Sequence, residues 1–173
     1  MKTFALFAII FVSAATAFSQ TSVYTDLSDT KCKTLRSDDE DGILYKGECA
    51  GVAGYKLHVI EGDLRQSIDV VFPNKTVHQL RFWEHFMAFS YTGPRAEWRI
   101  KNKKPFALIV RLNVSEDLND PSKTTSYLIV SKITKDFACV TDVVKPSKDQ
   151  NVQARKLADA SVNNPCMVAG SEK

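Results

Sequence analysis

Alternation of apolar and polar side chains is the feature that most constrains how this chain can fold. The clearest case is residues 96–101, where three apolar residues alternate with three charged ones: Ala96, Glu97, Trp98, Arg99, Ile100 and Lys101. Successive side chains of a β-strand point to opposite faces, so this period of two predicts a strand with one buried face. The same alternation occurs at 55–59 and at 68–72, on either side of a turn-like Glu61-Gly62-Asp63.

The longest apolar run, 106–114, follows a polar turn at 102–105 and predicts the central strand. Five residues are expected on one face of it: Phe106, Leu108, Val110, Leu112 and Val114. A polar loop at 115–125 separates this strand from two more, at 127–133 and 137–144. Strands joined in succession by short turns predict an antiparallel meander that forms a sandwich or an open barrel.

Two segments have a helical period instead. Phe82, Phe86 and Phe89 recur at i, i+4 and i+7, which predicts a short amphipathic helix within 80–90. Near the C-terminus, Ser147 and Gln150 match a capping box, which predicts the start of a second helix. An apolar stripe follows, formed by Ala154, Leu157, Ala158 and Val162, and Asn163-Asn164-Pro165 ends the helix. The expected fold class is therefore mainly β with a C-terminal helix, an α+β arrangement.

The N-terminus has the pattern of a secretion signal. Lys2 precedes an apolar run at 4–12, and Ala15 and Ala17 supply the small residues of a cleavage site. Residues 1–17 are thus expected to be a signal peptide, and residues 18–173 a single domain. A buried N-terminal helix is the alternative. The apolar run is too short to span a bilayer, which takes about 20 residues.

Four cysteines stand at 32, 49, 139 and 166, and in an exported chain an even number of cysteines indicates disulfides. Three pairings exist. Sequence context favours Cys32 with Cys49, which flank the turn-like 37–42, and Cys139 with Cys166, which flank the C-terminal helix. A zinc site made of four thiolates would be expected to show C-x-x-C spacing, which this chain lacks.

Basic residues gather on the two strands around the turn at 102–105. They are Arg95, Arg99, Lys101, Lys103, Lys104 and Arg111. Arg99 and Lys101 share a face, and Arg111 is expected to join them, with Glu97 and Tyr127 as neighbours. Such a patch would bind an anionic glycan, a lipid headgroup or an acidic protein. The alternative is an ordinary exposed sheet face in which Arg111 pairs with Glu97.

Other candidates carry a weaker signal. None of His58, His78 and His85 has a metal-ligand neighbour at i+2 or i+4 or a nucleophile motif beside it. The acidic run at 38–41, followed by Gly42, lacks the spacing of a calcium loop and predicts a hairpin tip. No cofactor or metal is expected. A net charge of +3, reduced to +2 by loss of Lys2, does not indicate nucleic-acid binding.

Two triplets, at Asn74 and Asn113, match the glycosylation sequon, although Asn113 falls in a predicted strand. Trp83 and Trp98 are expected in the core rather than on a ligand platform.

Five short segments are similar to parts of a group of small exported bacterial proteins of unknown function: 49–57, 63–67, 96–99, 107–111 and 139–142. The resemblance covers most of the mature chain and implies an exported bacterial protein, but no activity. A disulfide-bearing β domain behind a signal peptide also resembles the plan of periplasmic lysozyme inhibitors. Their S-G-x-x-Y inhibitory loop has no counterpart here, since Ser90-Tyr91-Thr92-Gly93 does not match it.

These observations predict a non-enzymatic binding or inhibitor-like protein, secreted or periplasmic, that acts through the basic strands 95–111 or the loop 115–125. A hydrolase that uses one of the three histidines with a carboxylate is the first alternative. An envelope structural protein is the second. Neither the partner nor the oligomeric state follows from the sequence.

Overall fold

The computed structural model describes residues 20–37, 44–117, 119–120 and 122–170, and the expectations for the leader at 1–17 and the acidic run at 38–42 lie outside them. The described residues form ten strands: β1 (Thr21–Asp26), β2 (Lys33–Arg36), β3 (Tyr45–Ala50), β4 (Lys56–Gly62), β5 (Arg65–Val71), β6 (Val77–Gln79), β7 (Ser90–Lys101), β8 (Lys104–Val114), β9 (Thr125–Ile133) and β10 (Ala138–Val144). They also form helix α1 (Gln150–Ala160) and two 3₁₀ turns, η2 (Phe82–Glu84) and η3 (Ser161–Asn163).

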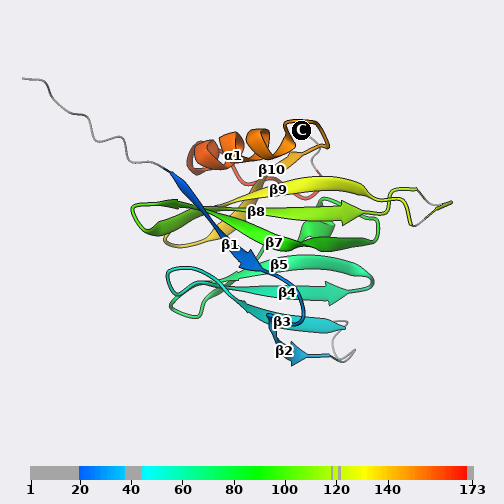
Figure 1. Cartoon of the computed structure of the whole chain (residues 1–173), viewed down its shortest axis with the longest axis horizontal. Coiled ribbons are helices and arrows are strands. Elements are labelled where there is room, and N and C mark those ends of the chain that lie inside the picture. Colours follow the sequence, from blue (N-terminus) through cyan, green and yellow to red (C-terminus); the bar gives the residue numbers. More distant parts are fainter. Residues whose placement is uncertain (1–19, 38–43, 118, 121, 171–173) are drawn as a thin grey trace, which may run out of the picture.

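The strands divide into two halves that meet between β5 and β7 (Figure 1). One half has the order β10-β9-β8-β7, with β1 also paired to β7; the other has the order β5-β4-β3-β2, with β6 also paired to β5. A single parallel pair, Arg65 with Ser90, joins the halves, and every other strand pairing among the described residues is antiparallel. The expected fold class, mainly β and antiparallel with a C-terminal helix, is confirmed.

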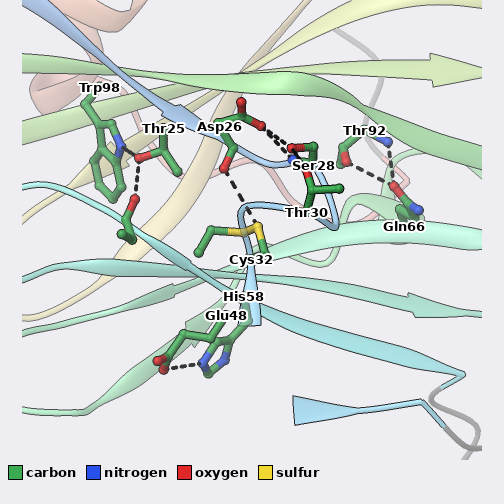
Figure 2. Close-up of a disulfide and its surroundings, with 12 residues drawn as sticks. Thr25, Asp26, Ser28, Thr30, Cys32, Glu48, His58, Gln66, Thr92 and Trp98 are labelled. Atoms are coloured by element: carbon green, nitrogen blue, oxygen red, sulfur yellow. Dashed lines mark hydrogen bonds and ion pairs between the residues drawn. A yellow bond between two sulfur atoms is a disulfide. The ribbon is translucent and has the colours of Figure 1, made fainter. Parts of the chain in front are cut away.

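The main core lies on the inward faces of both halves. Leu57 and Ile68 come from one half and Leu108 and Leu112 from the other, and all four are fully buried. Trp98 is also fully buried, as expected, while Trp83 is half-buried. The Trp98 indole N–H donates to Thr25 Oγ1 at 2.9 Å, and that hydroxyl donates to the carbonyl of Ala50, which ties β1 and β7 to β3 (Figure 2).

Helix α1 covers the outer face of β8 and β9 and makes a second, smaller core. Its Ala154 and Ala158 are fully buried against Ala107, Ile109 and Val130. The predicted apolar stripe is correct at these two alanines and at half-buried Leu157. It is wrong at Val162, which lies beyond the end of α1 and is 57% exposed.

Phe106 does not share the face of Leu108 and Val110 as predicted. The strand register shifts between Arg99 and Ile100, whose partners are Ala107 and Pro105, so Phe106 is the extra residue of a bulge. A bulge reverses the alternation on its N-terminal side, and Phe106 packs toward α1 instead.

The helix predicted within 80–90 is wrong. The segment contains only the single turn η2, and its backbone is hydrogen-bonded to residues of the sheet and its turn at both ends. The Phe82 N–H donates to Ser67 Oγ at 2.9 Å, and the Ser90 N–H donates to the carbonyl of Leu64 at 3.1 Å. Phe82 is consequently buried, whereas Phe89 is 50% exposed.

The predicted capping box is also wrong, because the Gln150 side chain has other partners. Its amide group donates to the carbonyls of Ser126 and Val144, at 2.7 Å and 3.0 Å. Gln150 therefore fastens the start of α1 to β9 and β10 rather than closing the helix N-terminus.

Both predicted disulfides are present, Cys32–Cys49 and Cys139–Cys166. The first lies beside the pairing of β2 with β3, and the carbonyl of Asp26 lies 3.7 Å from Cys32 Sγ (Figure 2). The second attaches the residues after η3, which we call the C-terminal strap (165–170), to β10. The strap's Met167 N–H donates to Val140, and its Gly170 N–H donates to Glu84, so the strap bridges β10 and η2.

Among the described residues, no helix has the length and apolar character needed to cross a bilayer.

Candidate functional site

The predicted basic stripe does not form one exposed patch. Lys101 and the turn residues Lys103 and Lys104 are exposed at the tip of the β7–β8 hairpin, and Arg95 is exposed farther along β7. Arg99 is only 7% exposed, and Arg111 is half-buried.

Arg99 and Arg111 share the sheet face that α1 covers, and they reach opposite ends of that helix. The pair Glu97–Ile109 separates them in the register. Arg99 binds Asp159 near the end of α1, whereas Arg111 Nη1 donates to Gln150 Oε1 at its beginning. The two arginines therefore do not converge on one point.

Tyr127 lies on the opposite face of the sheet, so the expectation that it neighbours Arg111 is wrong. Arg111 pairs with Leu128, and Tyr127 pairs with Leu112. The Tyr127 ring packs against Phe86 with 4.7 Å between centroids, and its hydroxyl donates to Glu116 at 2.7 Å.

Glu97 is the centre of an ion-pair network between β7 and α1. Arg155 donates to both of its carboxylate oxygens, at 2.7 Å and 3.1 Å, so the alternative pairing of Glu97 with Arg111 is wrong. Arg99 donates to both oxygens of Asp159, at 2.8 Å and 2.9 Å. Ser22 of β1 bridges the two pairs, since Arg99 donates to its hydroxyl and the hydroxyl donates to Glu97.

This network fixes the ionisation of its members. Burial alone would raise the pKa of Glu97, but hydrogen bonds from Arg155 and Ser22 outweigh it and hold that pKa below its usual value. Hydrogen bonding to Glu97 likewise raises the pKa of Arg155. Both groups are thus charged at neutral pH.

A hollow of about 350 Å³ opens where β1, β7, β8 and the first turns of α1 meet. We call it the arginine hollow; the polar residues that line it are Tyr24, Arg95, Glu97, Arg111, Asn151 and Arg155. The chain brings three guanidinium groups together here, from β7, β8 and α1, around one carboxylate.

The charge of the arginine hollow is not balanced by its own wall. Arg155 is bound by Glu97, but Arg111 has no ion pair among the described residues, and its hydrogen-bond partners Ser126 and Gln150 are neutral. The Arg95 guanidinium lies over the Tyr24 ring, 5.9 Å from its centroid. A planar guanidinium suits carboxylate, sulfate or phosphate because it presents two parallel N–H donors.

Arg155 and Tyr24 were not predicted as site residues. Arg155 lies on the predicted helix α1, but it is part of no motif. Tyr24 lies on β1, a strand that was not predicted from the sequence. The only sequence signal for Arg155 was its position next to Ala154 of the apolar stripe. A residue at the border of such a stripe lies close to the surface that the helix covers.

His58 stands in a polar row across three strands, between Glu48 of β3 and Asp69 of β5. Its Nε2 lies 3.5 Å from the Glu48 carboxylate (Figure 2). Burial lowers the pKa of His58 and raises the pKa of Asp69 to about 6. His58 does not line the arginine hollow.

His78 and His85 line a shallow hollow between β6 and β10. Burial lowers the pKa of His85, which keeps its imidazole neutral at pH 7. Within the described ranges, no group of three or more His, Cys, Asp or Glu residues is placed to hold a metal ion.

Of the two sequons, Asn74 lies exposed in the turn after β5. Asn113 is half-buried in β8, paired with Ser126. The predicted loop 115–125 is held in its described part by Lys123, which pairs with Asp117 and Asp120.

Comparisons of this chain with protein-family models, with curated proteins and with solved structures found no match.

Proposed function

We propose that this chain is an exported, non-enzymatic binding protein that holds an anionic group in the arginine hollow. The observation that carries the proposal is the surplus of positive charge there: Arg95, Arg111 and Arg155 surround a single carboxylate, Glu97. Side chains of one sign around a concavity strengthen the local field and attract a ligand of opposite charge.

Export is supported by two independent features of the chain. Disulfides persist in secreted and periplasmic proteins and are rare in the reducing cytosol, and this chain forms two. Residues 1–17 have the charged start, apolar centre and small-residue end of a signal peptide. Both features support our proposal that the protein acts in the periplasm or at the cell exterior.

The ligand's chemistry follows from the donors. Guanidinium groups bind oxyanions, and a hollow of about 350 Å³ is at the small end of ligand sites. The site therefore suits one carboxylate, sulfate or phosphate group with its adjoining atoms, carried by a glycan or by a lipid headgroup. Arg111 is the best placed to bind it, because its Nη1 is oriented by Ser126 and Gln150.

The test compares two charge-matched double variants of the mature protein. R95Q/R111Q removes two positive charges from the arginine hollow, and K103Q/K104Q removes two from the exposed hairpin tip. Titration calorimetry would use sodium sulfate, glycerol phosphate and a trigalacturonate as probes, so that glycan and lipid-headgroup sources are distinguished.

We expect the first variant to lose about tenfold or more in affinity for the best probe, and the second to lose less than about twofold. Equal losses in both variants would mean a diffuse charge effect rather than a site. Absence of wild-type binding to every probe, with capture of an acidic protein from envelope extract instead, would replace the small-anion proposal.

A further inference from the structure

A second hollow, of about 410 Å³, lies on the other side of the β8–β9 sheet, and we call it the apolar hollow. Most of its wall is apolar: Phe86, Met87, Ala88, Val114, Val143 and Met167. His85, Glu116, Tyr127 and Lys145 complete it. It shares no residue with the arginine hollow.

Four separate segments build this wall, and their anchoring to one another indicates that the hollow exists without a ligand. The Phe86 ring packs against Tyr127 of β9, and the backbone N–H of Met167 is bonded to Val140 of β10. The disulfide Cys139–Cys166 fastens the residue next to Met167. A preformed apolar concavity with a few polar groups is the usual form of a small-molecule site.

The polar groups gather at one end of the apolar hollow. Glu116 follows the end of β8, Tyr127 lies near the start of β9, and Lys145 follows the end of β10. These three strands are antiparallel neighbours, so the three positions lie at the same end of the sheet. A ligand that fits would have an apolar body and one polar head.

At that end the wall carries one carboxylate, Glu116, and one ammonium, Lys145, and in the described part of the chain only the carboxylate has a hydrogen-bond partner. Glu116 accepts a hydrogen bond from the Tyr127 hydroxyl, whereas the described residues offer Lys145 neither an ion pair nor a hydrogen bond. His85 adds no charge at neutral pH, since burial lowers the pKa of its imidazole. The Lys145 ammonium is thus the one charged group of the wall that still lacks a partner among the described residues.

Met87 supplies an independent sign that this surface is used. Its side chain is 84% exposed at the mouth of the apolar hollow, and the nearby Phe89 is 50% exposed. Large apolar side chains together on a surface mark interaction sites, and methionine adapts to ligands of different shapes.

We propose that the apolar hollow binds an amphipathic carboxylate of the fatty-acid class. The hydrocarbon chain lies against Phe86, Ala88 and Met167, and the carboxylate meets Lys145. This site is separate from the arginine hollow and does not depend on the function proposed for it.

The test uses three ligands with the same twelve-carbon chain and different heads: dodecanoate, dodecanol and dodecylamine. Calorimetry on the oxidised mature protein gives their affinities, and NMR shift mapping gives the site. A88W fills the apolar hollow, K145M removes the free charge, and K148M is the control, because Lys148 is an exposed lysine outside it.

Dodecanoate should bind best, and K145M should weaken it about threefold to fivefold, to the level of dodecanol. A88W should abolish binding of both, while K148M and R95Q/R111Q should leave both unchanged. Tightest binding of dodecylamine would show that Glu116 governs the site and would overturn the proposal. Dodecanoate binding that survives A88W in a folded protein, or no binding by wild type, would also overturn it.

Discussion

The arginine hollow and the apolar hollow lie on opposite faces of the same two strands, and they differ in every other respect. In β8 and β9, the neighbouring pairs Arg111–Leu128 and Leu112–Tyr127 point to opposite sides. Arg111 and Leu128 line the arginine hollow, while Tyr127 lines the apolar one. One alternating sequence therefore supplies a charged wall and an apolar wall, because consecutive strand residues face opposite ways.

The two hollows are also held together by different forces. Ion pairs between β7 and α1 position the wall of the arginine hollow, through Glu97 with Arg155 and Arg99 with Asp159. A disulfide and backbone hydrogen bonds position the C-terminal strap at the apolar hollow. A change that loosens one hollow should thus leave the other intact.

The largest effect is expected from removing Cys139–Cys166. The pair C139A/C166A should lower the free energy of unfolding by roughly 3 to 4 kcal/mol, because the bond closes a loop of 27 residues. Urea titration measures this. The variant should also lose dodecanoate binding, since Met167 is released, and it should retain anion binding in the arginine hollow.

The matched control is C32A/C49A, which should cost about 3 kcal/mol for its loop of 17 residues. That disulfide touches neither hollow, so both ligands should still bind to the folded variant. Loss of dodecanoate binding in both disulfide variants would show that general stability, rather than the C-terminal strap, maintains the apolar hollow.

Asp69 lines neither hollow, so a substitution there should change the stability of the protein without changing ligand binding. Burial raises its folded-state pKa from 3.8 to about 6, so its contribution to stability is full below pH 3.8 and is lost as the pH rises through 6. D69N should therefore stabilise the protein at pH 7.5 by about 2 to 3 kcal/mol and change little near pH 4. Urea titrations at both pH values test this, with binding in either hollow unchanged.

The charged groups near Asp69 oppose this shift without cancelling it. Lys46 and Arg81 favour its carboxylate, and its cross-strand neighbour His58 is held neutral by burial. A D69N variant that is less stable at pH 7.5 would show that the carboxylate is needed charged.

Arg99 tests whether the ion-pair network is structural. R99M removes the guanidinium donor that Asp159 and Ser22 share, and because the Asp159 side chain is 29% exposed, the loss should be about 2 kcal/mol. The arginine hollow should weaken with it, because α1 carries Arg155. Dodecanoate affinity should stay unchanged, and an equal loss there would mean that the two hollows are coupled.

The fold could be predicted from the sequence wherever local pattern and tertiary structure agree. Alternation predicted β4, β5 and the second half of β7, and the long apolar run predicted β8. The turn and the helix that the cysteines flank predicted both disulfides. The strand alternation failed at Phe106, where a bulge decides the structure. The helical period failed at 80–90, where long-range hydrogen bonds to Ser67 and Leu64 decide it. A period count cannot detect such distant partners.

The candidate site was predictable only in part. The sequence placed Arg95 and Arg111 near each other because a hairpin connects them. Arg155 comes from a helix about 60 residues away, and its contact with Glu97 depends on how α1 lies across the sheet. The apolar hollow was not predicted at all, since residues of four distant segments form it and none carries a motif.

The smallest effect on stability is expected from R111K, which tests how the arginine hollow recognises its ligand. This variant keeps the positive charge at the edge of the arginine hollow, and the half-buried position should tolerate it within about 0.5 kcal/mol. A lysine cannot hold Ser126 and Gln150 while presenting a planar pair of donors, so affinity for the best oxyanion probe should fall about fivefold. Calorimetry beside R111Q distinguishes the two contributions of the guanidinium. If R111K binds as well as wild type, charge alone attracts the ligand. A loss as large as that of R111Q would mean that the geometry of the guanidinium recognises the ligand. The described wall of the apolar hollow contains no arginine, so recognition of this kind is specific to the arginine hollow.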